Sequence, residues 1–232
     1  MKTIRAFIAV EIPDDVKRIA TDVGRQLAAS TPDGAIRWVK PNAMHLTLRF
    51  LGNTDEQLLP DISRVLDVVV ALPVFSLRLD QLGAFPNTKR PRALWLGLLG
   101  DRPDDVAALA TLKAAIDRGL EPLDWPVETK PFQPHLTLGR VREGRSPGDV
   151  PWQLAVPETV FPVTAIHAIE SDLLPVDHAT RSATQPNWRL RVNRQPGPGD
   201  TCGDRCATPG TGRQSLAQGN LLRRDHSSRA RY

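Results

Sequence analysis

The sequence contains one pattern twice, and its residues are of types that can do chemistry. K-P-N-A-M-H-L-T-L at residues 40–48 and K-P-F-Q-P-H-L-T-L at residues 130–138 both follow K-P-x-x-x-H-L-T-L. Residues two apart on a β-strand share a face, so each copy presents its histidine and its threonine together and turns its leucines the other way. The repeat predicts two similar strands, each of which offers an imidazole and a hydroxyl on one face.

The four polar side chains of the repeat, His45, Thr47, His135 and Thr137, suit the hydrolysis of a phosphodiester. Opening a cyclic phosphate needs a base that deprotonates water and an acid that protonates the departing oxygen, and imidazole can serve either role near neutral pH. Threonine hydroxyls can donate hydrogen bonds to the non-bridging oxygens, where charge accumulates in the transition state. Arg140 supplies a permanent cation that can help to hold the same phosphate.

Two other interpretations of the repeat stay open. A duplicated strand can be purely structural, because repeats also arise from packing. A metal site is the second, but threonine is a weak ligand and no carboxylate cluster with recognisable spacing lies beside either motif. We therefore expect chemistry that needs neither a metal nor another cofactor.

At these residues the sequence closely resembles the 2H phosphoesterase superfamily, and specifically the bacterial RNA 2′,3′-cyclic phosphodiesterases, also called 2′-5′ RNA ligases. The resemblance covers about residues 2–192 and rests on R-A-F-I-A-V-E-I-P, H-L-T-L-R-F-L-G, F-P-N followed by P-R-A-L-W-L-G-L, and F-Q-P-H-L-T-L-G-R. After E-S-D-L-L at residues 170–174 the sequence departs from the family, because it lacks the usual glycine and tyrosine before the last strand.

The resemblance implies two pseudo-symmetric lobes of mainly antiparallel sheet, flanked by helices, with the motifs facing each other across a central cleft. It also implies that RNA ending in a 2′,3′-cyclic phosphate is hydrolysed to a 2′-phosphate, with His45 as proton donor and His135 as proton acceptor. Three alternatives remain: a small cyclic nucleotide as substrate, ligation to a 5′-hydroxyl by the reverse chemistry, and a nucleotide- or RNA-binding module without turnover.

The order of the predicted elements independently favours an α+β fold. Hydrophobic periodicity predicts helices at 14–29, 58–69 and 103–116, and strands at 5–12, 36–39, 44–51, 74–79, 93–98, 134–142, 163–169 and 188–192. Gly52 and Asn53 predict a turn that ends the strand of the first motif. Residues 143–162 are rich in proline and predict an irregular interval.

Other side chains allow both a functional and an ordinary interpretation. Phe132, beside the second motif, is the aromatic residue that we expect to stack on a nucleobase, although most such aromatics belong to a core. Lys89, Arg90 and Arg92 in N-T-K-R-P-R can contact an RNA backbone or form a plain exposed turn. His167 and His178 are interpreted as structural or exposed residues.

Composition limits the remaining possibilities. The 232 residues predict a bilobal domain over 1–193 and a disordered, basic, low-complexity tail over 194–232, and seven arginines and three aspartates in that tail account for the whole formal charge of +4. The two cysteines lie in the tail as C-G-D-R-C and do not complete a zinc site. No apolar stretch is long enough to span a membrane, and we expect a cytoplasmic, monomeric, bacterial protein.

Overall fold

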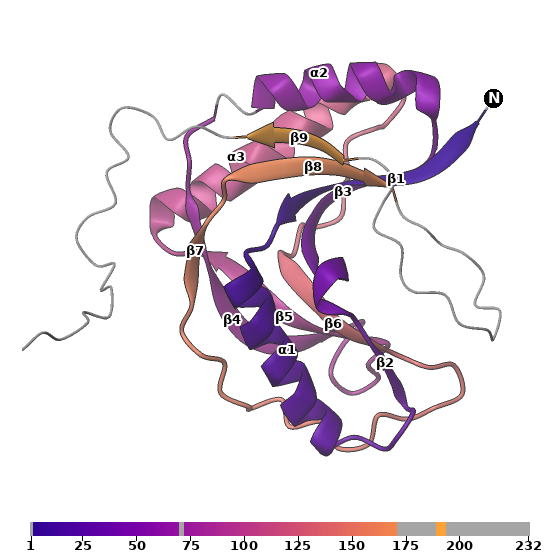
Figure 1. Ribbon diagram of the computed structural model, residues 1–232, viewed down its shortest axis with the longest axis vertical. Helices are drawn as coiled ribbons and strands as arrows, with labels where there is room; N and C mark the ends of the chain where they lie inside the picture. The colour runs from indigo at the N-terminus through magenta and orange to yellow at the C-terminus, as the bar shows by residue number, and fades with distance from the viewer. Residues whose placement is uncertain (1, 70–71, 171–188, 194–232) are drawn as a thin grey trace, which may run out of the picture. The chain divides into compact units, whose positions relative to one another are not determined.

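The computed structural model describes residues 2–69 and 72–170, together with the backbone of residues 189–193 (Figure 1). The predictions for His178 and for the tail at residues 194–232 lie outside these described residues. Among the described helices, none combines the length and the apolar character that crossing a membrane requires.

Three α-helices occur in the described residues, close to where periodicity predicts them: α1 (Asp14–Ala29), α2 (Leu59–Val69) and α3 (Pro103–Leu120). Helix α1 begins directly after Pro13, and two aspartates in its first turn complement the positive end of the helix dipole. Its buried side chains Val16, Ala20, Val23 and Leu27 recur every three or four residues, so one face of the helix packs inward.

The part of the chain that the structure describes forms one sheet of nine strands: β1 (Thr3–Glu11), β2 (Ile36–Trp38), β3 (His45–Asp55), β4 (Ser76–Phe85), β5 (Ala93–Gly100), β6 (His135–Val141), β7 (Val160–Pro162), β8 (Ala165–Glu170) and β9 (Arg189–Asn193). Their order is β7-β4-β5-β6-β3-β1-β8-β9, with β2 paired to β6. All of these pairings are antiparallel, so the predicted α+β fold with an antiparallel sheet flanked by helices is confirmed.

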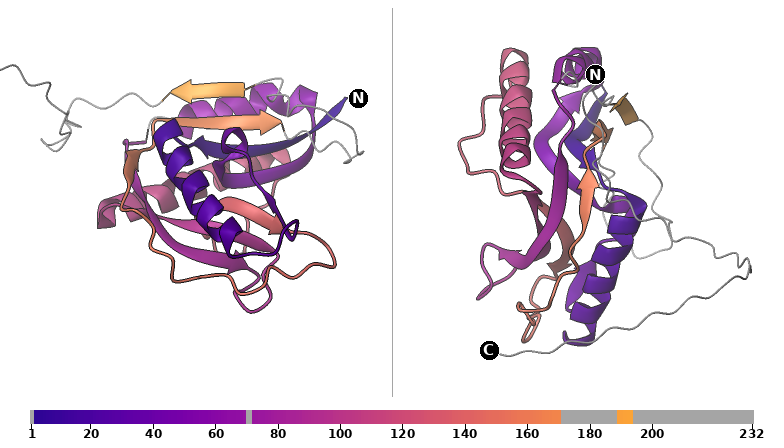
Figure 2. Two further views of the ribbon diagram at one scale, coloured as in Figure 1. Left: turned by 60° about the horizontal axis from the view of Figure 1, so that its bottom comes forward. Right: turned by 90° about the vertical axis from the view of Figure 1, so that its left-hand side faces the viewer.

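The sheet has two halves that meet at β3 and β6, the strands that carry the two motifs. We call β3, β1, β8 and β9 the first lobe, and β6, β5, β4, β7 and β2 the second lobe. Helices α2 and α3 pack against each other, and α3 contacts both β3 and β5 (Figure 1). Helix α1 lies at the other end of this view and contacts β6 (Figures 1 and 2).

The motif leucines anchor both strands in the core, as the alternation predicts. Leu46 and Leu136 are completely buried, and Leu48 and Leu138 are 2% and 1% exposed. Burying a leucine side chain contributes about 1.5–3 kcal/mol relative to leaving it in water. The inward leucines therefore fix which face of each strand carries the histidine and the threonine.

Two predictions about local structure were wrong. Strand β3 does not end at Gly52 but continues to Asp55; Gly52 has a φ of 69° next to a bulge, where Leu51 is the extra residue opposite β1. A glycine with positive φ thus serves a bulge here rather than a turn. The interval 143–162 also contains a short edge strand, β7, which pairs with β4.

Candidate active site

Strands β3 and β6 begin at the two histidines and meet in antiparallel orientation. Leu46 pairs with Leu136, and continuing this register places His45 opposite Thr137 and Thr47 opposite His135. Residues directly opposite each other in an antiparallel pair share a face of the sheet. The two imidazoles and the two hydroxyls therefore gather on one face, which we call the motif face, while the leucines point away from it.

All four polar side chains are half-buried, which suits groups that must contact both the protein and a ligand. They lie in the middle of a nine-stranded sheet on strands held from both sides: β1 flanks β3, and β5 flanks β6. A site carried by regular strands is held in place more firmly than one on loops.

Each motif strand has a bulge directly after its threonine. Leu48 is the extra residue opposite β1, and Leu138 is the extra residue opposite β5. A bulge reverses the alternation of side chains between the two faces. The two motifs therefore share a β-bulge as well as the H-L-T-L sequence.

The second bulge determines where Arg140 lies, which the sequence alone left open. Arg140 pairs with Ala93, while Thr137 pairs with Trp95 two residues further along β5. Ala93 and Trp95 share a face, so Arg140 lies on the motif face with Thr137 and His135. The predicted phosphate-binding arginine is thus on the same side of the sheet as the histidines.

The first bulge has a different consequence in β3. Arg49 pairs with Ile8 and is turned to the opposite face, whereas Phe50 pairs with Phe7 on the motif face. The rings of Phe7 and Phe50 are 6.1 Å apart between centroids, and Phe50 is 58% exposed. An exposed aromatic ring therefore occupies the place in the first lobe that Arg140 occupies in the second.

His135 is arranged to stay neutral and to accept a proton. Its Nδ1 lies 2.7 Å from the backbone oxygen of Gln133. A carbonyl can only accept, so Nδ1 carries a hydrogen, and in the neutral ring Nε2 therefore has the lone pair. Burial lowers the pKa of His135 below its ordinary value of 6.5; the bond to Gln133 opposes this shift, and the positive charge of Arg140 adds to it. The rings of Phe85 and Trp95 lie 4.8 and 6.0 Å from the imidazole.

His45 has the opposite electrostatic neighbour. Its ring is stacked on Phe7, with centroids 4.5 Å apart and planes inclined by 27°, and its cross-strand partner in β1 is Glu11. Oε2 of Glu11 also lies 2.9 Å from Nε2 of His167 in β8. A carboxylate next to one histidine and a guanidinium next to the other make the two motifs electrostatically unequal.

His167, interpreted from the sequence as structural or exposed, is buried at 2% exposure. It pairs with Ala9, which itself pairs with Thr47, so the third histidine lies on the motif face as well. Sequence reasoning missed its partner Glu11 and the contacts of Phe7 and Phe85 with the two histidines. The period-two series Phe7, Ala9 and Glu11 in β1 was the signal that could have revealed this lining.

The structure does not bring Phe132 against the histidine rings. This side chain packs against the core, and Lys113 Nζ of α3 lies 5.9 Å from the centre of its ring. Base stacking by Phe132 stays a prediction, and Phe50 is the exposed aromatic on the motif face. The described residues contain no group of three or more histidine, cysteine, aspartate or glutamate side chains suited to a metal ion.

Comparisons with known proteins find relatives in sequence. The family model of the 2′-5′ RNA ligase superfamily matches residues 12–173. An RNA 2′,3′-cyclic phosphodiesterase of Thermotoga maritima is 29% identical over 81% of this chain and 92% of the relative. A second protein of that name, from Archaeoglobus fulgidus, is 30% identical over 60% of this chain and 73% of its own length.

Solved structures show the same fold. The crystal structure of TT0787 from Thermus thermophilus superposes with a TM-score of 0.58 at 25% identity, covering 83% of this chain and 96% of that one. The crystal structure of E. coli LigT complexed with 3′-AMP gives a TM-score of 0.59 at 24% identity, covering 82% and 99%. With two H-L-T-L strands meeting at one sheet face and a family match over most of the described residues, this chain belongs to the 2′-5′ RNA ligase superfamily.

Proposed function

We propose that the protein hydrolyses the 2′,3′-cyclic phosphate of RNA or of a nucleoside to a 2′-phosphate, without a metal, by general acid–base catalysis. The observation that carries this proposal is the pairing of Leu46 with Leu136, whose register sets both histidines and both threonines on one face. The names of the relatives from Thermotoga and Archaeoglobus support the same substrate class. The proposed catalytic domain is residues 1–193, acting as a cytoplasmic monomer.

In the proposed reaction His135 is the base. Its Nε2 accepts a proton from water, the resulting hydroxide attacks phosphorus, and the bond from phosphorus to the 3′ oxygen breaks. In the neutral ring, the hydrogen bond from Nδ1 to the Gln133 oxygen leaves the lone pair on Nε2, where it can accept this proton. Burial and Arg140, which both lower the pKa of His135, keep this imidazole neutral at pH 7.

His45 is the proposed acid, which gives its proton to the departing 3′ oxygen. The carboxylate of Glu11 lies opposite His45 across the β1–β3 pair, whereas the guanidinium of Arg140 lies on the side of His135. The unequal neighbours of the two histidines thus support the same division of roles as the family resemblance. The reverse reaction would join a cyclic end to a 5′-hydroxyl with the same groups, but the abundance of water favours hydrolysis.

Thr47 and Thr137 donate hydrogen bonds to the non-bridging oxygens, and Arg140 adds a positive charge on the second-lobe side. Phe50, the exposed ring of the motif face, is placed to stack on the terminal base. These contacts bind the phosphate before the reaction and stabilise the charge that grows on its oxygens during it.

Incubation with adenosine 2′,3′-cyclic phosphate in the presence of EDTA tests the proposed function directly. We expect turnover, with adenosine 2′-phosphate as the sole product, because the acid, the base and the hydrogen-bond donors are all side chains. Activity that disappears on chelation and returns with zinc, magnesium or manganese would contradict the proposal. Binding without any product would favour the non-catalytic alternative.

Replacing Thr47 or Thr137 by alanine should lower kcat/KM for the cyclic phosphate by roughly 10- to 150-fold. This range corresponds to the loss of one hydrogen bond to a charged group, about 1.5–3 kcal/mol. The matched control is Thr54→Ala, at the far end of the same strand β3, which should leave kcat/KM nearly unchanged. Equal effects on kcat/KM at Thr47 and Thr54 would show that the motif threonines do not bind the phosphate.

The pH dependence of kcat/KM should be bell-shaped, because one histidine must be neutral and the other protonated. The rising limb belongs to His135, and its midpoint should lie below pH 6.5, since burial and Arg140 lower this pKa. Arg140→Gln removes the positive charge, so the pKa of His135 rises and the rising limb moves to higher pH. Arg37→Gln, across the β2–β6 pair from Arg140, is the control and should leave that limb in place; an unmoved limb in Arg140→Gln would disprove the assignment.

A further inference from the structure

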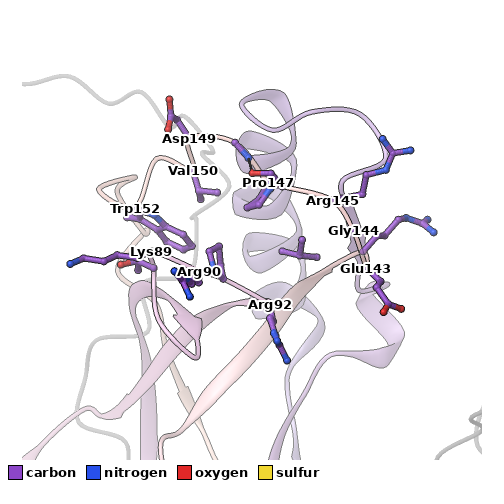
Figure 3. Close-up of a pocket in the computed structure, with 16 residues that line it drawn as sticks. Lys89, Arg90, Arg92, Glu143, Gly144, Arg145, Pro147, Asp149, Val150 and Trp152 are labelled. Carbon is purple, nitrogen blue, oxygen red and sulfur yellow. Dashed lines mark hydrogen bonds between the residues drawn. The ribbon is translucent and has the colours of Figure 1, made fainter.

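A hollow of about 1010 Å³ lies between the β4–β5 turn and the loop that follows β6 (Figure 3). The turn supplies Lys89, Arg90 and Arg92, and the loop supplies Arg142 and Arg145. Figure 3 shows Lys89 and Arg90 on one side, Arg145 on the other, and Arg92 between them. Two segments about fifty residues apart in the sequence thus combine their cations around one concave surface.

The hollow carries an excess of unpaired positive charge. Its five cations are opposed by only two carboxylates, Glu143 and Asp149. Within the described part of the chain, none of the five has an ion-pair partner, whereas other surface arginines such as Arg25 and Arg78 do. Cations that the fold leaves unpaired around a concave surface attract a polyanion.

Both walls of the hollow are held by backbone hydrogen bonds. Val141 N donates to the oxygen of Arg92 at 2.9 Å, which ties the turn to β6. Arg145 N donates to the oxygen of Arg142 at 3.1 Å around Gly144, whose φ of 69° suits glycine. On the other wall, Asn87 Oδ1 accepts from the backbone nitrogens of Lys89 and Arg90. The backbone that carries the cations is therefore ordered before a ligand arrives, which lowers the entropic cost of binding.

Strand β6 connects this hollow to the catalytic groups. His135 and Thr137 lie near its start, Arg140 follows on the motif face, and Val141 and Arg142 already line the hollow. At about 3.3 Å per residue, the strand covers about 16 Å from Thr137 to Arg142, the span of a short stretch of single-stranded RNA. The positive charge thus continues from the site of chemistry to the hollow.

An aromatic side chain completes the hollow. Trp152 lines it beside Lys89 and is partly buried, so one part of its indole is held by the protein and another is accessible (Figure 3). Cations that track a backbone, combined with an aromatic ring on which a base can stack, are the two parts of a single-strand binding surface.

We propose that the hollow binds the phosphates on the 5′ side of the cyclic terminus, so that the preferred substrate is an RNA strand and not a cyclic mononucleotide. This inference rests on the proposed function and names its substrate class. A cyclic mononucleotide reaches only the motif face, whereas an oligoribonucleotide contacts the motif face and the hollow together. Binding in the hollow therefore lowers KM for RNA and does not affect kcat.

The test compares two substrates and two matched double variants. Arg142→Gln/Arg145→Gln removes two charges from the hollow, and Arg64→Gln/Arg118→Gln removes two charges from the exposed faces of α2 and α3. KM and kcat are measured for adenosine 2′,3′-cyclic phosphate and for a short oligoribonucleotide with the same cyclic terminus, at several salt concentrations.

We expect the wild type to have a lower KM for the oligonucleotide than for the mononucleotide. The hollow variant should raise the oligonucleotide KM roughly 2- to 30-fold, as for the loss of two exposed ion pairs. Its plot of log KM against log salt should lose about 0.7 of slope for each phosphate contact removed. Both constants for the mononucleotide, and all constants of the helix variant, should stay as in the wild type.

An oligonucleotide KM that does not change in the hollow variant, or that rises equally in the helix variant, overturns the inference. An equal rise for both substrates also overturns it, because the hollow would then act on the catalytic site itself. The failure of the proposed function is a separate result, namely a wild-type protein that does not turn over the mononucleotide.

Discussion

Replacing either His45 or His135 by alanine is expected to lower kcat for the cyclic phosphate by about 10² to 10⁴, the usual contribution of a general acid or base. Both losses should be of this size although the two histidines differ in environment, because the reaction needs one proton removed and one delivered. Steady-state kinetics with adenosine 2′,3′-cyclic phosphate measure the effect. Thermal unfolding of each variant shows whether the fold is intact.

The kcat of the double variant should be only a little lower than that of the less active single variant, because the acid and the base act as one unit. Fully additive losses would mean that the two histidines contribute independently, for example by binding alone. A single variant with the kcat of the wild type would contradict the two-histidine mechanism.

Replacing Asp117 by alanine is expected to lower the free energy of unfolding by about 3–5 kcal/mol, as breaking a buried ion pair does. Asp117 in α3 lies between two buried cations: its Oδ1 is 3.3 Å from Arg49 Nη1, and its Oδ2 is 2.5 Å from Lys113 Nζ. Without Asp117, the acidic partner that both cations keep among the described residues is Glu128, which is 41% exposed. Urea denaturation measures the loss.

The control for Asp117 is Asp61→Ala, which removes an ion pair with Arg64 on the surface of α2. An exposed pair of this kind contributes about 0.2–1 kcal/mol. A loss of the same small size for Asp117→Ala would show that the buried cations find new partners or reach water. Arg49 follows the bulge in β3 and points away from the motif face. The Asp117 variant should therefore have a lower free energy of unfolding but a nearly unchanged kcat.

The motif face could be predicted because two signals in the sequence agree. Strict alternation in H-L-T-L places the polar and the apolar side chains on opposite faces of a strand. The repetition of K-P-x-x-x-H-L-T-L indicates that two strands present the same side chains in the same way. Helix α1 was equally accessible, since Val16, Ala20, Val23 and Leu27 have helical spacing directly after Pro13. In each case the information lies within one segment of about ten residues.

The bulges could not be predicted, because a bulge depends on how two strands pair rather than on one strand alone. Alternation continued past Thr137 would turn Arg140 away from the site, whereas the bulge at Leu138 returns it to the motif face. The same effect exposes Phe50 and buries Arg49 in the network with Asp117. Gly52 was mistaken for a turn signal for this reason, since a bulge and a turn can both use a glycine with positive φ.

Contacts between distant segments form the second class of feature that the sequence did not reveal. Glu11 and His167 are more than 150 residues apart, and only the pairing of β1 with β8 brings them together. The basic hollow likewise needs the pairing of β5 with β6 to place Arg92 near Arg142. A charge run such as Lys89 to Arg92 indicates function only when its spatial neighbours are known.

The central claim, that His45 protonates the leaving oxygen while His135 activates water, is tested most directly by a substrate with sulfur in place of the 3′ oxygen. A thiol has a pKa of about 8.5, so a thiolate departs with little need of a proton. We predict that His45→Ala recovers most of its lost rate on this substrate and that His135→Ala does not. Selective recovery of His135→Ala would reverse the two roles, and equal recovery of both variants, or of neither, would contradict the division of labour between the two motifs.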